Sequence, residues 1–226
     1  MITLSNLSKS YDSNLVLKNI QLTFQSGKVY GIVGENGAGK TTLFKCIAGL
    51  ENYAGTIESD LIPLKNHLGL LLTEPFYFDR ITGREYLQLM CNARMVELKQ
   101  VDAKNIFDLP LDQYASTYST GMKKKLALLG ILVQNNQYYI FDEPYNGVDI
   151  HSNMLITEII LKLKQLGKTV LVSSHIFSTL RDTCDEIILL KNGEIAQQVD
   201  ADSFDLVENE MKKTMIGNKI EQLELK

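Results

Sequence analysis

Apolar residues are spaced along the chain in two ways, and this predicts strands that alternate with helices. Residues 2–7 and 15–24 show partial alternation of apolar and polar side chains, as half-buried strands do. Residues 29–33, 138–141 and 169–173 are continuous apolar runs, typical of strands buried on both faces of a parallel sheet. Within residues 186–195, the pair Asn192-Gly193 predicts a hairpin turn.

Helical spacing of apolar residues occurs in segments 41–50, 83–95, 122–133 and 154–166. Two of these segments lie between about residues 74 and 134, where strand signals are few. The last twenty or so residues are charged and weakly helical, so we expect an appendage there and not another domain. The pattern predicts an α/β fold with a mostly parallel sheet, an antiparallel N-terminal β part and a helical insertion.

The composition narrows the class of protein. The chain has 226 residues, of which 45% are apolar and 22% charged, and its formal net charge is -4. This acidic balance argues against a nucleic-acid partner, which would usually meet a basic face. No apolar run approaches the roughly 18 residues that cross a bilayer, and the polar N-terminal residues do not resemble a signal peptide. We expect a cytoplasmic protein that reaches a membrane only through another chain.

A glycine-rich loop lies between the predicted strand 29–33 and the predicted helix 41–50. It reads Gly34-Glu35-Asn36-Gly37-Ala38-Gly39-Lys40-Thr41 and matches the phosphate-loop pattern in full. In this setting, backbone N–H groups and a helix N-terminus converge on one anion. We expect Gly34, Asn36, Gly37, Gly39, Lys40, Thr41 and Thr42 to bind the phosphates of a nucleotide, with Thr41 also on Mg²⁺.

Two carboxylates directly follow the buried run 138–141. Asp142 and Glu143 are expected at the carboxyl edge of the sheet, where ligands bind in α/β folds. Asp142 suits Mg²⁺, and Glu143 suits the activation of an attacking water. A plain polar loop after a strand is the alternative for this pair alone.

A third motif resembles one family, the ABC ATPases. Residues Tyr118-Ser119-Thr120-Gly121-Met122 open a predicted helix and resemble the family signature Leu-Ser-Gly-Gly-Gln. Ser119 can cap that helix, whose N-terminus offers positive potential to a γ-phosphate. The resemblance implies that Ser119 and Gly121 bind nucleotide, although simple capping is the common use of such a sequence.

Other landmarks of the family occur in its usual order. Tyr11 lies where such ATPases stack an aromatic ring on adenine, and His175 lies where they have a switch histidine that acts in catalysis. Residues 146–149 resemble the loop whose aspartate joins two subunits. One landmark departs: instead of the family's glutamine near Mg²⁺, the chain has Thr73 and Glu74, and either residue can occupy the place. We assign Glu74 to the metal site.

The resemblance implies one nucleotide-binding domain over residues 1–226. Its core is expected at about 1–73 and 135–200, its helical subdomain at about 74–134, and a C-terminal extension at about 201–226. The family's active site is shared by two such domains, so the implied partners are a second nucleotide-binding domain, in a homodimer or heterodimer, and a separate transmembrane permease. The protein would then lie peripherally on the cytoplasmic face of the membrane.

The implied activity is ATP hydrolysis that drives transport. The alternatives are a non-transport ABC ATPase acting on ribosomes or DNA, and an ATP sensor without turnover. The segment Thr73 to Leu87 resembles exporters of bacitracin-like peptides and lantibiotics. For the basic run Lys123, Lys124 and Lys125, we prefer a solvated helix face over contact with phosphate or a membrane surface.

Overall fold

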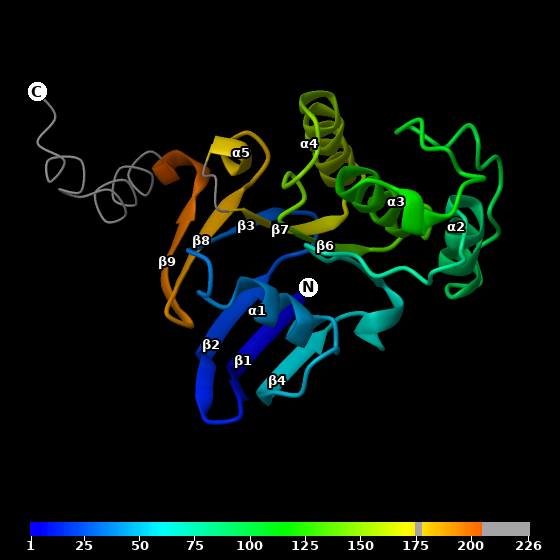
Figure 1. Cartoon of the computed structure of the whole chain (residues 1–226). Coiled ribbons are helices and arrows are strands. Elements are labelled where there is room, and N and C mark those ends of the chain that lie inside the picture. The colour runs from blue at the N-terminus through cyan, green and yellow to red at the C-terminus, as the bar shows by residue number, and fades with distance from the viewer. Residues whose placement is uncertain (175–177, 205–226) are drawn as a thin grey trace, which may run out of the picture.

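The computed structural model describes residues 1–174 and 178–204, and it arranges their strands in two sheets (Figure 1). The smaller sheet is antiparallel with the order β2-β1-β4. Its strands are β1 (Ile2–Tyr11), β2 (Asn14–Phe24) and β4 (Ala54–Ser59). This sheet confirms the predicted antiparallel N-terminal part.

The larger sheet has six strands in the order β5-β6-β7-β3-β8-β9. Its members are β3 (Val29–Val33), β5 (Leu68–Leu71), β6 (Tyr138–Asp142), β7 (Thr169–Ser174), β8 (Glu186–Lys191) and β9 (Glu194–Asp200). Neighbouring strands are parallel except β8 and β9, which form an antiparallel hairpin. Asn192 and Gly193 both have positive φ in its turn, as the sequence predicts for this pair.

The helices are α1 (Lys40–Ile47), α2 (Gly83–Asn92), α3 (Thr120–Leu132), α4 (Ile150–Gln165) and α5 (Ser178–Arg181). Single 3₁₀ turns occur at η1 (Leu64–Asn66), η2 (Ala115–Thr117) and η3 (Ala201–Ser203). Helix α4 begins earlier than the apolar spacing predicts, because Asp149 caps it: its Oδ1 accepts from Ser152 N at 2.8 Å. Thr82 and Glu85 form a capping box that fixes the start of α2.

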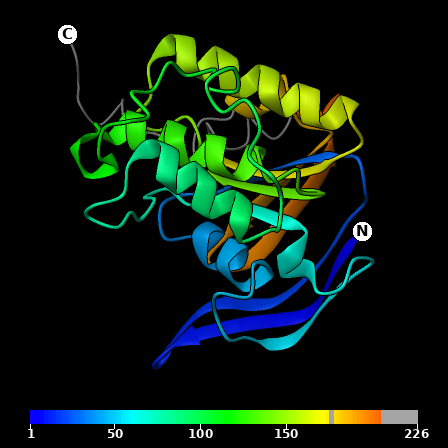
Figure 2. The ribbon, with the colours of Figure 1, turned by 90° about the vertical axis from the view of Figure 1, so that its right-hand side faces the viewer.

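The larger sheet carries a hydrophobic core on each face, because side chains alternate along its buried strands. Tyr30 and Ile32 of β3 pack with α1 and the antiparallel sheet, whereas Val29 and Val33 pack in the core that includes residues of α2, α3 and α4. Figure 2 shows α1 between the antiparallel sheet and the larger sheet, with α3 and α4 on the opposite side. The layers therefore place the start of α1 and the start of α3 on different sides of the sheet.

The apolar pattern did not predict β4 and β5. β4 is a partly exposed strand that contains the polar residues Thr56, Glu58 and Ser59, so it lacks an apolar run. β5 has only four residues, too few for a periodic signal, and it is defined by parallel pairing with β6. The predicted C-terminal appendage lies outside the described residues from position 205 onward.

Candidate nucleotide site

The predicted phosphate loop connects β3 to α1, with Gly34 directly after the strand and Lys40 opening the helix. A Cβ at Gly34 would lie 2.4 Å from the carbonyl oxygen of Leu190, so only glycine fits there. Gly39 has φ 108, and a Cβ there would lie 2.8 Å from Leu17 Cδ2. The loop is thus formed by close packing against β8 and β2, with its backbone curled at the end of the sheet.

Lys40 folds back over this loop. Its Nζ donates to the carbonyl oxygen of Gly34 at 2.7 Å and to that of Glu35 at 3.3 Å. The side chain is buried, and the same ammonium lies 3.5 Å from Glu143 Oε1. The Lys40 ammonium therefore lies at the loop, where an anion would meet both it and the backbone N–H groups.

Asp142 ends β6 and is fully buried among hydroxyl groups. Its Oδ2 accepts from Thr41 Oγ1 at 2.6 Å and from Thr73 Oγ1 at 2.7 Å, while its Oδ1 accepts from Ser173 Oγ at 2.7 Å. These three residues come from the start of α1, the loop after β5 and the end of β7. Parallel strands bring their carboxyl ends to one edge, which explains the convergence.

Sequence reasoning missed the part of Ser173 in this cluster and left that of Thr73 open. Thr73 was one of two alternatives at the junction; the structure places its hydroxyl on Asp142, whereas Glu74 is exposed. Ser173 lies directly opposite Asp142 in the register of β6 and β7. A signal existed in the polar residue that ends the apolar run 169–173, but the pairing of strands was needed to give it a partner.

Glu143 follows Asp142 with a left-handed backbone, φ 50, which is rare for a residue with a side chain. Its N–H donates to Ser173 Oγ at 2.9 Å, and its carbonyl oxygen accepts from Lys124 Nζ at 2.9 Å. Together with the 3.5 Å approach of Oε1 to Lys40 Nζ, these contacts place Glu143 over the phosphate loop.

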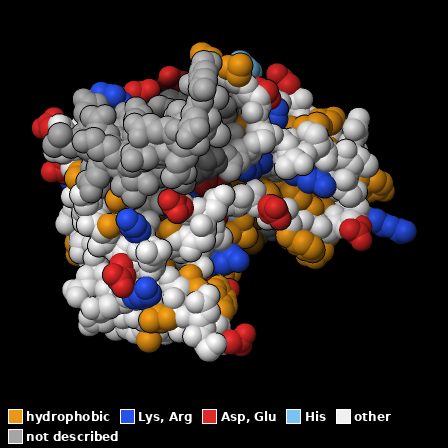
Figure 3. Space-filling view, turned by 60° about the vertical axis from the view of Figure 1, so that its left-hand side comes forward, with side chains coloured by type: hydrophobic (Ala, Val, Ile, Leu, Met, Phe, Trp, Pro, Cys, Tyr) orange, Lys and Arg blue, Asp and Glu red, His pale blue; other side chains and the backbone are white. Residues whose placement is uncertain are grey.

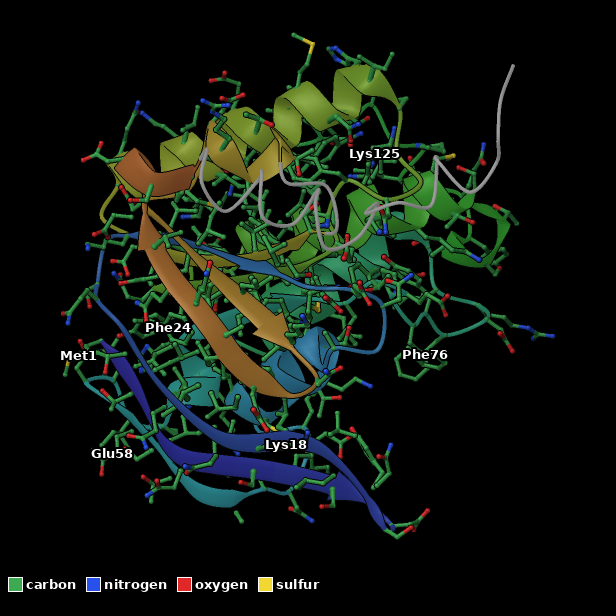
Figure 4. The ribbon with its side chains drawn as sticks, turned by 90° about the vertical axis from the view of Figure 1, so that its left-hand side faces the viewer. Met1, Lys18, Phe24, Glu58, Phe76 and Lys125 are labelled. Atoms are coloured by element: carbon green, nitrogen blue, oxygen red, sulfur yellow. The ribbon has the colours of Figure 1, made fainter. Side chains whose placement is uncertain are left out.

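The prediction of a solvated lysine run is wrong for Lys124, which is 2% exposed. Burial lowers the pKa of its ammonium, although the negative charges of Glu143, Asp142 and Glu74 act in the opposite direction. Lys125, labelled in Figure 4, forms a 3.3 Å ion pair with Asp149. Helix α3, which carries the run, packs on the larger sheet. Lys124 lies on its buried face, whereas Lys123 and Lys125 are only partly buried.

The signature segment lies at the exposed start of α3. Ser119 caps the helix by accepting from Met122 N at 3.2 Å, as the sequence predicts. A Cβ at Gly121 would lie 2.7 Å from the carbonyl oxygen of Gly147, so glycine allows the first turn of α3 to touch the loop after β6. The Asp149 cap on α4 depresses the pKa of its carboxyl through hydrogen bonds from Ser152.

Tyr11 ends β1, is partly exposed and lies beside the ion pair of Lys9 and Glu51. Lys9 Nζ lies 4.6 Å from the centre of the Tyr11 ring and 3.0 Å from Glu51 Oε2. Burial and a hydrogen bond with Glu51 raise the pKa of the Tyr11 phenol, while a hydrogen bond with Thr42 opposes the rise. Tyr11 therefore lies beside the start of α1. His175 lies outside the described residues.

The fold and this loop define the class of protein, a phosphate-loop nucleotide-binding protein with paired acidic residues at the sheet edge. The sequence model of the ABC transporter family matches residues 17–146, and the chain belongs to this family. The resemblance inferred from the motifs is confirmed. The chain is an ATP-binding subunit of the ABC transporter type, an ATPase whose ATP hydrolysis is coupled to transport.

Known proteins support this assignment over most of the chain. ABC transporter ATP-binding protein NatA of Bacillus subtilis is 34% identical over 215 residues, which cover 86% of this chain and 87% of that protein. Lantibiotic transport ATP-binding protein SrtF of Streptococcus pyogenes is 30% identical, with 92% and 94% covered. Bacitracin transport ATP-binding protein BcrA of Enterococcus faecalis is also 30% identical, with 88% and 69% covered.

Solved structures agree on the fold. A structure described as the ATP-binding subunit of an ABC transporter superposes with a TM-score of 0.80 at 25% identity, covering 92% of this chain and 93% of that one. A second, a dimeric cassette named MJ0796 with bound ADP and phosphate, has a TM-score of 0.80 at 21% identity, with 89% and 99% covered. Within residues 1–174 and 178–204, no helix is long and apolar enough to cross a bilayer.

Proposed function

We propose that this chain hydrolyses ATP at the edge of the larger sheet and that the resulting opening and closing of a dimer drives a separate membrane-spanning subunit. One observation carries the proposal: Lys40, Thr41, Asp142 and Glu143 converge from two segments, with Thr41 Oγ1 2.6 Å from Asp142 and Lys40 Nζ 3.5 Å from Glu143. This arrangement provides both a cation for phosphate and carboxylates for metal and water.

The residues present fit Mg²⁺, a hard cation that takes oxygen ligands and usually combines one or two carboxylates with substrate phosphates. The Thr41 hydroxyl and the Asp142 carboxylate already meet at 2.6 Å and would hold it, with Thr73 on the same carboxylate oxygen. Glu74, exposed at the next position, remains our prediction for a further residue at the metal site. When bound, the ion would neutralise charge on the phosphates.

In this proposal the chain's own groups divide the chemistry. Gly34, Asn36, Gly37 and Gly39 supply a loop whose backbone N–H groups, with Lys40, bind the β- and γ-phosphates. Glu143 accepts a proton from the attacking water, and His175 contacts the γ-phosphate. Tyr11 stacks on the adenine, and Thr42 follows Thr41 on the first turn of α1.

The second half of each site comes from another copy or a similar chain. Ser119 and Gly121 lie at the exposed N-terminus of α3, where the helix end offers positive potential. They would face the γ-phosphate bound to the partner, so ATP favours the closed pair and hydrolysis releases it. The dimeric state of the MJ0796 cassette supports such a pair.

The membrane subunit would dock on the helical part, residues 74–134, which we propose as the helical subdomain. Phe76 and Phe78 are 77% and 60% exposed and form an edge-to-face pair in the loop before α2. In Figure 4, Phe76 lies on the side of the molecule opposite Met1 and Glu58. Figure 3 shows a hollowed face, with hydrophobic side chains on the part of the surface that projects above the hollow. Docking there would hold the chain on the cytoplasmic face of the membrane.

We further propose a membrane-active peptide as the cargo. The support is the resemblance of the segment Thr73 to Leu87 to peptide exporters, together with relatives named for lantibiotic and bacitracin transport. Deleting the gene in its native cell should raise sensitivity to such a peptide. Unchanged sensitivity to both peptide classes would contradict the cargo while leaving the ATPase proposal intact.

The catalytic proposal is tested with Glu143→Gln, which keeps the side-chain volume and removes the proton acceptor. We expect this variant to bind ATP, to elute as a stable dimer in size-exclusion chromatography with MgATP, and to turn over at least roughly a hundredfold more slowly than the wild type. A turnover rate equal to that of the wild type would remove Glu143 from the chemistry.

The membrane partner is tested by copurification. Gentle solubilisation of native membranes should recover a multi-span protein with the tagged chain.

A further inference from the structure

Lys124 is a buried cation whose contacts lead to Glu143. Its Nζ donates to the backbone oxygen of Glu143 at 2.9 Å and to that of Asn146 at 2.8 Å. Both acceptors belong to the loop between β6 and α4, whereas Lys124 lies on the second turn of α3. The contacts therefore join the helix that follows the signature segment to the loop that carries Glu143.

The burial of this ammonium is a feature that needs a physical reason. Taking a charged group out of water is unfavourable unless hydrogen bonds and opposite charges compensate for lost hydration. Here two carbonyl oxygens accept from Lys124, and the negative charges of Glu143, Asp142 and Glu74 also favour the charged ammonium. An apolar residue at this position would leave the loop's carbonyl oxygens without this donor.

The loop that Lys124 holds has an unfavourable backbone. Glu143 has φ 50, and a non-glycine residue keeps such a conformation only where the surrounding structure imposes it. Ser173 Oγ accepts from the Glu143 N–H at 2.9 Å, and Lys124 binds the Glu143 carbonyl oxygen from the other side of the residue. These two contacts fix the backbone on both sides of the Glu143 side chain.

We infer that Lys124 is a positioning residue for Glu143: it holds the loop after β6 so that the Glu143 carboxylate faces Lys40 and the phosphate loop. The inference rests on the proposed role of Glu143. Because Lys124 lies on the helix that Ser119 caps, it also ties the signature segment to the carboxylate within one chain. Lys124 does not itself touch the reacting atoms.

The test is Lys124→Met, which retains a long apolar stem and removes the donors. We expect kcat for MgATP to fall by about tenfold or more while KM changes by less than about twofold, since a misplaced Glu143 affects the chemical step and not nucleotide binding. Binding of a non-hydrolysable ATP analogue should match the wild type. Lys124→Arg keeps the charge and several donors and should recover part of the lost kcat.

Lys123→Met is the matched control, because it removes a neighbouring ammonium that is only half-buried. A kcat of Lys124→Met equal to that of this control would overturn the inference. The inference would also be overturned if kcat fell only in proportion to the fraction of the protein that still binds nucleotide, because that result indicates a purely structural role. If Lys124→Met does not fold, Lys124→Gln takes its place with the same expected split between kcat and KM.

Glu143→Gln measured alongside separates the inference from the function on which it rests. Slow turnover in Glu143→Gln with wild-type turnover in Lys124→Met overturns the positioning role alone. Wild-type turnover in both variants overturns the proposed role of Glu143 as well.

Discussion

The Nζ of Lys40 lies 3.5 Å from Oε1 of Glu143, and neither side chain is more than 10% exposed. One residue opens α1 and the other follows β6, so the sheet's parallel topology is what makes them neighbours. A bound phosphate would meet the cation on one side and the carboxylate on the other, which suits a site that binds an anion and activates water.

Lys40→Ala is expected to weaken ATP binding by at least about tenfold, because it removes the charge that the loop directs at the phosphates. Isothermal titration with ATP would measure the change. Lys45→Ala on the same helix is the control and should bind as the wild type does. Equal affinity of both variants would contradict the assignment of the phosphate loop.

Thr73→Val is expected to raise the Mg²⁺ concentration that half-saturates the ATPase by roughly 2- to 10-fold, the equivalent of one hydrogen bond of about 0.5–1.5 kcal/mol. The reason is that the Thr73 hydroxyl orients Asp142 through a 2.7 Å hydrogen bond. A magnesium titration of ATPase activity measures this. Thr56→Val, on the exposed strand β4, should leave the titration unchanged. An unaltered magnesium requirement in Thr73→Val would exclude such a part for Thr73.

Gly121→Ala is expected to lower the free energy of unfolding by about 1–3 kcal/mol, because the added methyl would overpack the loop after β6. The new Cβ would lie 2.7 Å from the carbonyl oxygen of Gly147. Urea unfolding would measure the change. Thr120→Ala, at an exposed neighbouring position, should stay within about 0.5 kcal/mol of the wild type. A Gly121→Ala variant as stable as this control would show that the contact relaxes freely.

The double variant Phe76→Ser and Phe78→Ser is expected to keep the ATPase activity of the detached chain but to lose copurification with the membrane subunit. Both rings are exposed, so the chain should fold without them, whereas a docked partner would bury them. Ile62→Ser, at another exposed apolar position, is the control for surface hydrophobicity. Undiminished recovery of the membrane subunit with the double variant would contradict the docking surface.

Local signals in the chain predicted most of the elements and motifs. The buried strand β3 and the glycine-rich loop after it can be recognised from the residue types at positions 29–41 alone. No tertiary contact is therefore needed to find Lys40 and Thr41. The Ser119 cap was predicted from the sequence in the same way, whereas the Asp149 cap was not, and the start of α4 was therefore placed too late. Strands β4 and β5 were missed because their stability comes from pairing with β1 and β6 and not from their own apolar pattern.

The sequence alone determined the class of the protein, because phosphate binding depends on a short contiguous loop and on a strand that ends in acid. Only the tertiary structure decided which distant side chains complete the site. The Thr73 and Ser173 hydroxyls reach Asp142 because β5, β6 and β7 are adjacent in the sheet. Lys124 is buried because α3 packs on that sheet beside the loop after β6. Such contacts join residues far apart in the chain, and the spacing of apolar residues, which reflects local structure, does not predict them.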